Sequence, residues 1–237
     1  ERNDIFTNAQ CGFRKNRSTV DHILVLDTEV RAAFTQRKHL GAIFFDIEAA
    51  YDSVLRHVVL RKLFNFGIRG CMGFFIQNFL SGRTFRVRVG NHLSAPHCQE
   101  NGIPQGGVLS VALFAVMIND IGEKLPAAIG RSLFVDDLAI WYSAANASHM
   151  SRQLQLAVTR LEQWSRANGL KFSTSKTVAV HFCRRRCPDP GLGIRLYGRA
   201  IPTEQAAKFL GVHFDRRLTY KDHFKALRDR CFKALNV

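Results

Sequence analysis

The chain has 237 residues, of which 46% are hydrophobic and 22% charged, so it can bury a sizeable core and is not a disordered protein. Its 34 lysines and arginines against 19 acidic residues give a formal net charge of +15. This excess favours a polyanionic partner, of which nucleic acid is the commonest.

Membrane attachment and secretion are disfavoured. No basic cluster adjoins an apolar anchor, and the longest apolar stretch, Val108 to Ile118, is too short to span a bilayer. No secretory signal opens the chain, so we expect an intracellular protein with free thiols.

His181, Cys183 and Cys187 resemble half of a zinc site, but no second pair of ligands follows at a usual spacing.

The first half of the chain is predicted to contain three helices and two strands. Apolar spacing indicates a helix over residues 19–37, then a strand over 41–46. A second helix is expected over about 48–65. Residues 84–89 alternate with period two and predict a half-exposed strand with arginines on one face. Residues 107–121 are almost all apolar, which indicates a helix buried on most sides.

The second half gives an α+β pattern. Asp136 and Asp137 lie between two short apolar runs, as at the tip of a hairpin. An amphipathic helix is expected over residues 151–167, closed by Asn168-Gly169. The remaining elements are three short strand regions and a basic helix, expected around residues 177–182, 194–202, 207–214 and 219–236.

The aspartates are the chemically most informative residues. Burying two like charges side by side is unfavourable, so a divalent cation is the natural partner of Asp136 and Asp137. Asp46 ends a second apolar run, and if the two runs form neighbouring strands, the three carboxylates converge on one metal site. Taken alone, Asp136-Asp137 is equally compatible with a solvated turn.

Further blocks flank the acidic runs in a characteristic order. With those runs, from about Gln10 to Asp215, they resemble a reverse transcriptase of the non-LTR retrotransposon (LINE-type) class. Group II intron maturases and telomerase share this palm, but the Phe-Val-Asp-Asp form and the Lys-Phe-Leu-Gly block point to the retroelement. The flanking blocks are residues 10–19, 101–110, 169–177 and 208–212.

The resemblance implies an α+β fold, namely the right-hand polymerase palm, an antiparallel sheet with packed helices. Partial fingers are expected over residues 1–40, a palm with inserted fingers elements over 41–215, and the start of a thumb over 216–237. Because the chain begins with Glu1 and the expected upstream fingers sequence is absent, we interpret it as a fragment.

The same resemblance assigns catalytic and substrate roles. Asp46, Asp136 and Asp137 are implied to hold two Mg²⁺ ions, with Mn²⁺ as an alternative, and Lys176 to protonate the leaving pyrophosphate. The implied substrate-binding residues are Arg14 at the triphosphate, Tyr51 against the sugar 2′ position, and Gln105 and Gly106 against the incoming nucleotide and template. Apart from the resemblance, Tyr51 could be core packing, and Arg14 and Lys176 could be solvated surface residues.

The implied partners are an RNA template, a DNA primer and deoxynucleoside triphosphates, with no membrane; the oligomeric state is left open. Action in the nucleus and a cytoplasmic RNA-bound form are expected. Two residues depart from the family pattern: Gly107 replaces the usual serine and Val111 the usual proline. The predicted nucleic-acid contacts are Lys15, Arg17, Arg86, Arg88, Lys208 and Gly211.

Two other functions compete with this interpretation. A non-catalytic nucleic-acid-binding remnant of a retroelement is favoured by the fragmentary ends and by Gly107 and Val111, but the intact aspartates argue against it. A two-metal nuclease also uses aspartates, but it explains neither the glutamine-glycine loop nor the spacing from Asp46 to Tyr51.

Overall fold

The computed structural model describes residues 6–7, 10, 12, 14, 17–184 and 191–235. Its centre is a five-stranded sheet with the strand order β11-β8-β1-β7-β6. All neighbours in it are antiparallel except β11 and β8, which are parallel, so the expected antiparallel palm sheet is confirmed. The strands are β1 (His39–Phe45), β6 (Gly130–Phe134), β7 (Asp137–Ala144), β8 (Val178–Phe182) and β11 (Thr203–Glu204).

Strand β1 is central, and all seven of its residues are buried. Successive side chains of a strand point to opposite faces, and here both faces are covered. Phe45 therefore belongs to the core on one face and Phe44 to the core on the other. This double burial explains why β1 appears in the sequence as a continuous apolar run.

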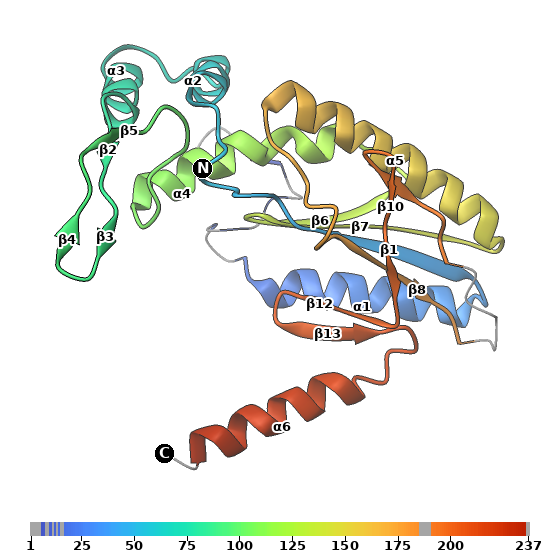
Figure 1. Cartoon of the computed structure of the whole chain (residues 1–237). Helices are drawn as coiled ribbons and strands as arrows, with labels where there is room; N and C mark the ends of the chain where they lie inside the picture. The colour runs from blue at the N-terminus through green and yellow to red at the C-terminus, as the bar shows by residue number, and fades with distance from the viewer. Residues whose placement is uncertain are drawn as a thin grey trace.

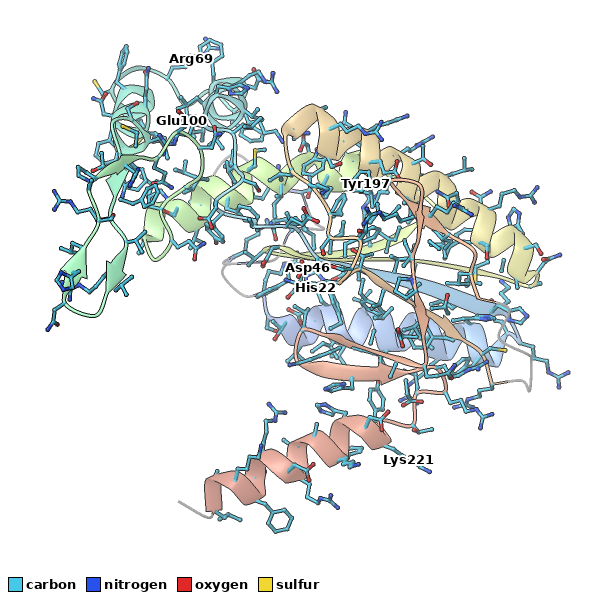
Figure 2. The ribbon with its side chains drawn as sticks, viewed as in Figure 1. His22, Asp46, Arg69, Glu100, Tyr197 and Lys221 are labelled. Atoms are coloured by element: carbon cyan, nitrogen blue, oxygen red, sulfur yellow. The ribbon has the colours of Figure 1, made fainter. Side chains whose placement is uncertain are left out.

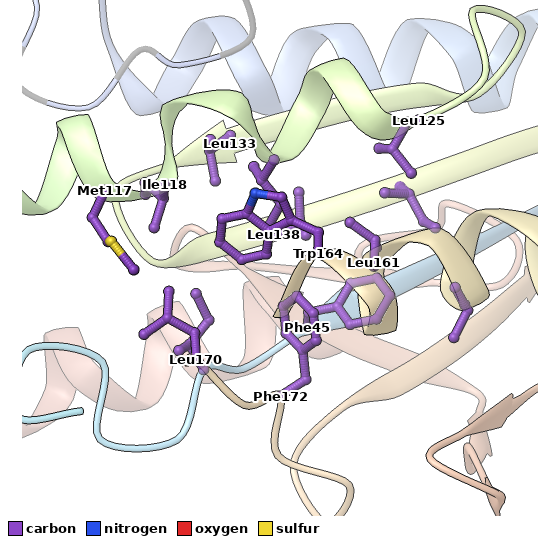
Figure 3. Close-up of a cluster of buried hydrophobic side chains, with 14 of the residues drawn as sticks. Phe45, Met117, Ile118, Leu125, Leu133, Leu138, Leu161, Trp164, Leu170 and Phe172 are labelled. Atoms are coloured by element: carbon purple, nitrogen blue, oxygen red, sulfur yellow. The ribbon is translucent and has the colours of Figure 1, made fainter. Parts of the chain in front are cut away.

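Helices α4 (Val108–Ile118) and α5 (Ala147–Asn168) cover one face of the sheet (Figure 1). The 3₁₀ helix η1 (Asn119–Lys124) continues α4 and adds Ile121 to the same core. Figure 3 shows the core beneath them, in which Phe45 and Phe172 lie with ring centroids 5.0 Å apart. Each fully buried large apolar side chain there contributes roughly 1.5–3 kcal/mol to folding. A Cβ on Gly41 would lie 2.7 Å from Leu154 Cδ1, so a larger residue there would force the Leu154 side chain of α5 to shift.

The other face carries helix α1 (Thr19–Thr35) and the hairpin of β12 (Ala206–Phe209) and β13 (Val212–Asp215) (Figure 1). Leu26 and Val30 of α1 pack in the same core as Phe214 of β13. The sheet is therefore covered on both faces, by α4 and α5 on one and by α1 and the β12–β13 hairpin on the other.

Two parts of the chain project from the sheet (Figure 1). Helix α6 (Lys221–Leu235) has no buried residue. No helix in the described part of the chain combines the length and the apolar character needed to cross a bilayer. The other projection comprises α2 (Arg56–Asn65), α3 (Gly70–Leu80) and four two-residue strands, β2 (Thr84–Phe85), β3 (Arg88–Val89), β4 (His92–Leu93) and β5 (His97–Cys98).

Two predicted elements are wrong in extent. The helix expected from residue 48 begins only at Arg56, because residues 48–53 form turns in which Ala49 has a φ of +46°. The continuous half-exposed strand expected over 84–89 is divided into β2 and β3, and both of its faces are exposed. The ladder is interrupted at Val87, whose backbone N–H donates to the Ser94 hydroxyl at 3.0 Å.

The remaining predicted helices are confirmed within a few residues, as is the hairpin that carries Asp136. Helix α5 starts four residues before the predicted start because the Asn146 side chain accepts hydrogen bonds from the backbone N–H groups of Ser148 and His149. The strand regions 194–202 and 207–214 are each a tight hairpin instead of one strand, formed by β9 (Arg195–Leu196) with β10 (Arg199–Ala200) and by β12 with β13.

Candidate active site

The three aspartates lie at one end of the central sheet. Asp46 directly follows β1, and Asp136 lies in the two-residue turn between β6 and β7, next to Val135, whose φ is +57°. Phe45 pairs with Leu138, so continuing the register by one residue places Asp46 opposite Asp137. Figure 2 shows Asp46 at the end of the sheet that faces the projecting helices. The two acidic runs are therefore neighbouring strands, as the sequence predicts.

The carboxylates influence one another electrostatically. Partial desolvation, followed by the charges of Asp136 and Asp46, raises the pKa of Asp137 above its ordinary value. The three carboxylates are therefore electrostatic neighbours at one end of the sheet. A cation between them would offset the repulsion and the desolvation together.

The segment 173–177 holds Asp46 in place. The backbone N–H of Ser173 donates to the carbonyl of Asp46 at 2.7 Å, and the Asp46 N–H lies 3.5 Å from the Thr177 hydroxyl. Lys176 Nζ lies 3.6 Å from Asp46 Oδ2, with the two side chains 71% and 40% exposed. An ion pair as exposed as this one adds little to the stability of the fold. It matters because it places the Lys176 ammonium group beside the carboxylates.

Tyr51 lies against a buried aromatic ring. It stacks on Phe114 of α4 with a centroid distance of 4.6 Å and an interplanar angle of 18°. Burial, followed by the negative charge of Asp136, raises the pKa of the Tyr51 hydroxyl. Tyr51 is therefore fixed near the acidic turn. Phe114 is a supporting residue that sequence reasoning missed, since it occurs within a uniformly apolar helix.

The glutamine-glycine loop is attached to the segment that carries Tyr51. The N–H of Ile103 donates to the Tyr51 carbonyl at 2.9 Å, and a Cβ on Gly102, whose φ is +87°, would lie 2.9 Å from the Asp52 carbonyl oxygen. Gln105 Nε2 donates to Asp52 Oδ1 at 3.3 Å, an interaction that gives Asp52 a positioning role absent from the sequence prediction.

Gly106 and Gly107 follow at the start of α4. Gly106 has a φ of +90°, and nothing lies within 4 Å of the place where its Cβ would be, so a ligand can approach the backbone there. Gly107 is the N-cap of α4, and a Cβ on it would lie 3.1 Å from Ser110 Oγ. The buried Ser110 hydroxyl thus occupies space next to the position where the family pattern has a serine.

The early block lies beside the acidic turn. Gln10 bridges to Leu133 of β6, and a Cβ on Gly12 would lie 2.7 Å from Val135 Cγ2. Arg14 donates from Nη1 to the carbonyls of Thr7 and Gln10, each at 3.0 Å. Part of this guanidinium is thus engaged with its own segment, and its contact with a triphosphate stays a prediction.

The comparisons with known proteins give the family. The family model "Reverse transcriptase (RNA-dependent DNA polymerase)" matches residues 2–214. The chain belongs to the reverse transcriptase family. It is 30% identical to the "Probable RNA-directed DNA polymerase from transposon BS" of Drosophila melanogaster and 27% identical to the "RNA-directed DNA polymerase from mobile element jockey" of the same organism. These alignments cover 98% and 90% of the chain but 27% and 24% of the relatives, so the chain spans about a quarter of their length.

Solved structures support the reverse transcriptase fold independently. Telomerase from Candida tropicalis in complex with a fragment of telomeric RNA superposes with a TM-score of 0.61, covering 90% of this chain and 33% of that one at 13% identity. The apo form of the same enzyme gives a TM-score of 0.60 over 93% of this chain and 37% of that one at 14% identity. At such identities the likeness concerns the fold.

Four of the six predicted nucleic-acid contacts lie on two hairpins. Arg86 and Arg88 are exposed on the projecting β2–β5 region. Lys208 is exposed on β12, and Gly211 forms the β12–β13 turn with Leu210; both turn residues have positive φ. Phe209 packs on Phe44 with ring centroids 5.4 Å apart, which places this turn near the end of β1. Arg17 is exposed, and Lys15 lies outside the described residues.

The family generally uses divalent metal ions. The aspartates of this chain fit that use, because oxygen is the ligand that hard divalent cations prefer and because burial, together with the charges of Asp136 and Asp46, raises the pKa of Asp137. Lys176 is a basic group in contact with the triad, through Asp46.

Proposed function

We propose that this chain is the polymerase part of a non-LTR retrotransposon protein, which extends a DNA 3′ end on an RNA template with deoxynucleoside triphosphates. The observation that carries the proposal is the joint placement of Asp46, Asp136 and Asp137 at one sheet end, with the ring of Tyr51 fixed beside them. A nuclease site would require the carboxylates but would not require that ring.

Asp46, Asp136 and Asp137 would hold two Mg²⁺ ions, or Mn²⁺ in their place. Two such ions, when bound, stabilise the attacking and leaving oxygens of an in-line displacement at phosphorus. The task of the chain is to hold the three carboxylates close together and in fixed positions. The β1–β7 pairing and the Ser173 N–H on the Asp46 carbonyl supply that rigidity.

Lys176 would donate the proton that the departing pyrophosphate accepts. Its ammonium group lies 3.6 Å from Asp46 Oδ2, on the surface of the same sheet end, so it is within reach of a phosphate bound at the carboxylates. An ammonium group in that position can act as a general acid. Arg14, through its remaining nitrogens, would contact the triphosphate from the side of the acidic turn.

Tyr51 would select the sugar by contact. Its ring cannot retreat, because it already stacks on the fully buried Phe114. A ribose 2′-hydroxyl directed at this ring would be excluded, whereas a deoxyribose would fit. Gln105 and the open backbone at Gly106 would pack against the base pair being formed.

The nucleic acid would lie along the basic surface. Arg86, Arg88, Lys208 and Gly211, with Lys15 and Arg17, would contact phosphates of the RNA–DNA hybrid, largely without regard to sequence. The reaction would take place in the nucleus at the chromosomal target, and the RNA-bound protein would form in the cytoplasm. The intact aspartates favour this function over a non-catalytic remnant.

The test is primer extension on an RNA template with Mg²⁺ and four deoxynucleotides, using the chain joined to the flanking segments of a relative. We expect extension by the wild type and by Asp222→Asn, which removes an exposed carboxylate on α6, and none by Asp136→Asn. If wild type and Asp136→Asn both bind the hybrid and neither extends it, the remnant function becomes the better one.

A further inference from the structure

A second cluster of metal-ligating side chains lies at the end of β1 opposite Asp46. It consists of His39, at the start of β1, and of His181 and Cys183, at the end of β8. Within the residues that the structure describes, this is the trio of His, Cys, Asp or Glu whose ligand atoms all lie within 4.8 Å of one another. We propose that this His-His-Cys cluster binds one zinc ion.

The strand register brings the three residues onto one face of the sheet. Gly41 pairs with His181 and Leu40 with Phe182, so continuing the register places His39 opposite Cys183. Residues two apart on a strand, and residues directly opposite on antiparallel strands, share a face. The arrangement therefore follows from backbone pairing and does not depend on chance side-chain rotamers.

The atoms that would bind the ion are close. His39 Nδ1 lies 3.0 Å from His181 Nε2, with the ring centroids 5.1 Å apart and the rings tilted by 38°. Zinc bonds of about 2.0–2.1 Å to nitrogen and 2.3 Å to sulfur bring tetrahedral ligand atoms to roughly 3.5 Å from one another. Small side-chain movements are enough to convert the observed spacing into a coordination sphere.

The surroundings suit zinc better than a hard cation. The three side chains are 9%, 3% and 2% exposed, and they offer two imidazole nitrogens and one sulfur, the set that zinc prefers. A hollow of about 270 Å³ reaches His39 and Cys183 from the surface beside Phe34 and Arg37, which gives an ion and a fourth ligand a route of entry. The sequence-predicted Cys187 lies outside the described residues, and the proposal does not depend on it.

The proposed zinc would act on structure and not on nucleotidyl transfer. Asp46 follows His39 by seven steps along β1, which at about 3.3 Å per residue is roughly 23 Å. Its effect would be to link β1 to β8 at the far end of the sheet. The competing explanation is a histidine pair that joins the strands by a hydrogen bond without metal, and the experiment separates the two.

The experiment measures metal content and cysteine protection on the 237-residue chain. Purified protein is stripped with a chelator, given one equivalent of Zn²⁺ and desalted, and its zinc content is measured by mass spectrometry. We expect about one zinc per chain in the wild type and in Cys231→Ser, an exposed cysteine on α6, and less than about a tenth of that in Cys183→Ser and His181→Asn. Zn²⁺ should also raise the melting temperature of the wild type, whereas Mg²⁺ should not.

A second readout needs no variant, so a folding failure of Cys183→Ser cannot leave the question open. Zn²⁺ should protect Cys183 of the wild type from alkylation while the exposed Cys71, Cys98 and Cys231 react as before. Co²⁺ in place of Zn²⁺ should give a sulfur-to-metal charge-transfer band. Equal alkylation of Cys183 with and without Zn²⁺, or a zinc content unchanged in Cys183→Ser, would overturn the proposal in favour of the metal-free histidine pair.

Discussion

At the scale of single residues, the proposed sugar selection by Tyr51 depends on the ring of Phe114 beside it. Tyr51 stacks on Phe114, which is fully buried in α4 beneath it. A side chain with a rigid neighbour can exclude a substrate atom, whereas a mobile one moves aside. Selectivity against ribonucleotides should therefore depend on the ring and not on the hydroxyl of Tyr51.

Tyr51→Ala should raise ribonucleotide incorporation relative to deoxynucleotide incorporation by at least about tenfold, the discrimination that a steric contact of this size supplies. Tyr51→Phe, which keeps the ring, should leave the ratio unchanged. The measurement is single-nucleotide extension with matched ribo- and deoxynucleotides. Unchanged selectivity in Tyr51→Ala would remove Tyr51 from the sugar-binding surface.

His22 on α1 is a buried titratable residue near the site. Its side chain is 7% exposed, Nδ1 is hydrogen-bonded to the Ser132 hydroxyl of β6, and its ring lies edge-on to Phe134. Burial, with a contribution from the charge of Arg17, lowers the pKa of His22 below 6.5, although Asp21 opposes the shift. Well above pH 6.5 the imidazole is neutral in both states and contributes no pH dependence. Below it the unfolded chain gains a proton that the native state resists, so stability falls.

His22→Gln should therefore flatten the loss of unfolding free energy between pH 7 and pH 5, by at most about 1.4 kcal/mol per pH unit, the value of one proton. His57→Gln, which changes an exposed histidine on α2, is the matched control and should leave the slope as in the wild type. Urea titrations at several pH values give the slopes. A slope that is the same in His22→Gln and wild type would show that His22 is protonated equally in both states.

Some site residues were predictable from the sequence and others were not. Two apolar runs ending in carboxylates imply strands of one sheet, so the adjacency of Asp46 and Asp137 could be predicted. Phe114 could not be identified, because nothing distinguishes one aromatic position within a helix apolar on all sides. The binding of Arg14 to nearby backbone carbonyls depends on a loop conformation that has no sequence signature.

At the scale of elements, the C-terminal end of helix α5 directs the chain back to the active site. Gly169 closes the helix with a φ of +72°, and a Cβ on it would lie 2.2 Å from Leu55 Cδ1, next to the start of α2. The same residue thus ends α5 and allows α2 to pack near it. Three residues later, Phe172 joins the core under Asp46.

Gly169→Ala should lower the unfolding free energy by about 2–4 kcal/mol, because the left-handed backbone conformation costs about 1–2 kcal/mol and the contact with Leu55 adds an overpacking cost. Gly198→Ala is the control for the backbone cost alone: its φ is +80° and nothing lies within 4 Å of its Cβ position. Chemical denaturation of both variants gives the difference. Equal costs in the two variants would mean that Leu55 moves aside freely.

Element boundaries were predictable where they depend on local chemistry. The Asn168-Gly169 stop of α5 is local and was predicted correctly. The division of residues 84–89 depends on Ser94, between β4 and β5, whose hydroxyl accepts the Val87 N–H. The sequence of residues 84–89 alone does not reveal this contact. The late start of α2 depends on Gly102 and Ile103, which bond back to the turns before the helix.

At the scale of the whole molecule, charge and shape together determine how nucleic acid binds. The net charge of +15 gives a long-range attraction to phosphates, and the exposed arginines of the β2–β5 hairpin extend beyond the sheet (Figure 1). Binding through such contacts releases counterions, so the affinity should fall steeply with salt. The slope of log affinity against log salt measures the number of phosphates contacted.

Replacing both Arg86 and Arg88 by alanine should reduce that slope by about 1.4–1.8 if each arginine contacts one phosphate. The control replaces Arg152 and Arg160, two exposed arginines on the outer side of α5, and should leave the slope nearly unchanged. Fluorescence anisotropy with an RNA–DNA hybrid at several salt concentrations gives the values. Equal slopes for the hairpin variant and wild type would place the nucleic acid elsewhere on the surface.

The most direct test of the central claim locates the divalent metal ion on the chain. Fe²⁺ bound in place of Mg²⁺, with ascorbate and peroxide, cleaves the backbone next to its ligands. We expect cuts near residue 46 and near residues 136–137 that excess Mg²⁺ suppresses and that Asp136→Asn abolishes, whereas cuts near residues 39 and 181–183 would belong to the His-His-Cys cluster and persist with Mg²⁺. The absence of Mg²⁺-suppressed cuts at the aspartates, in protein shown to be folded, would contradict a metal site there.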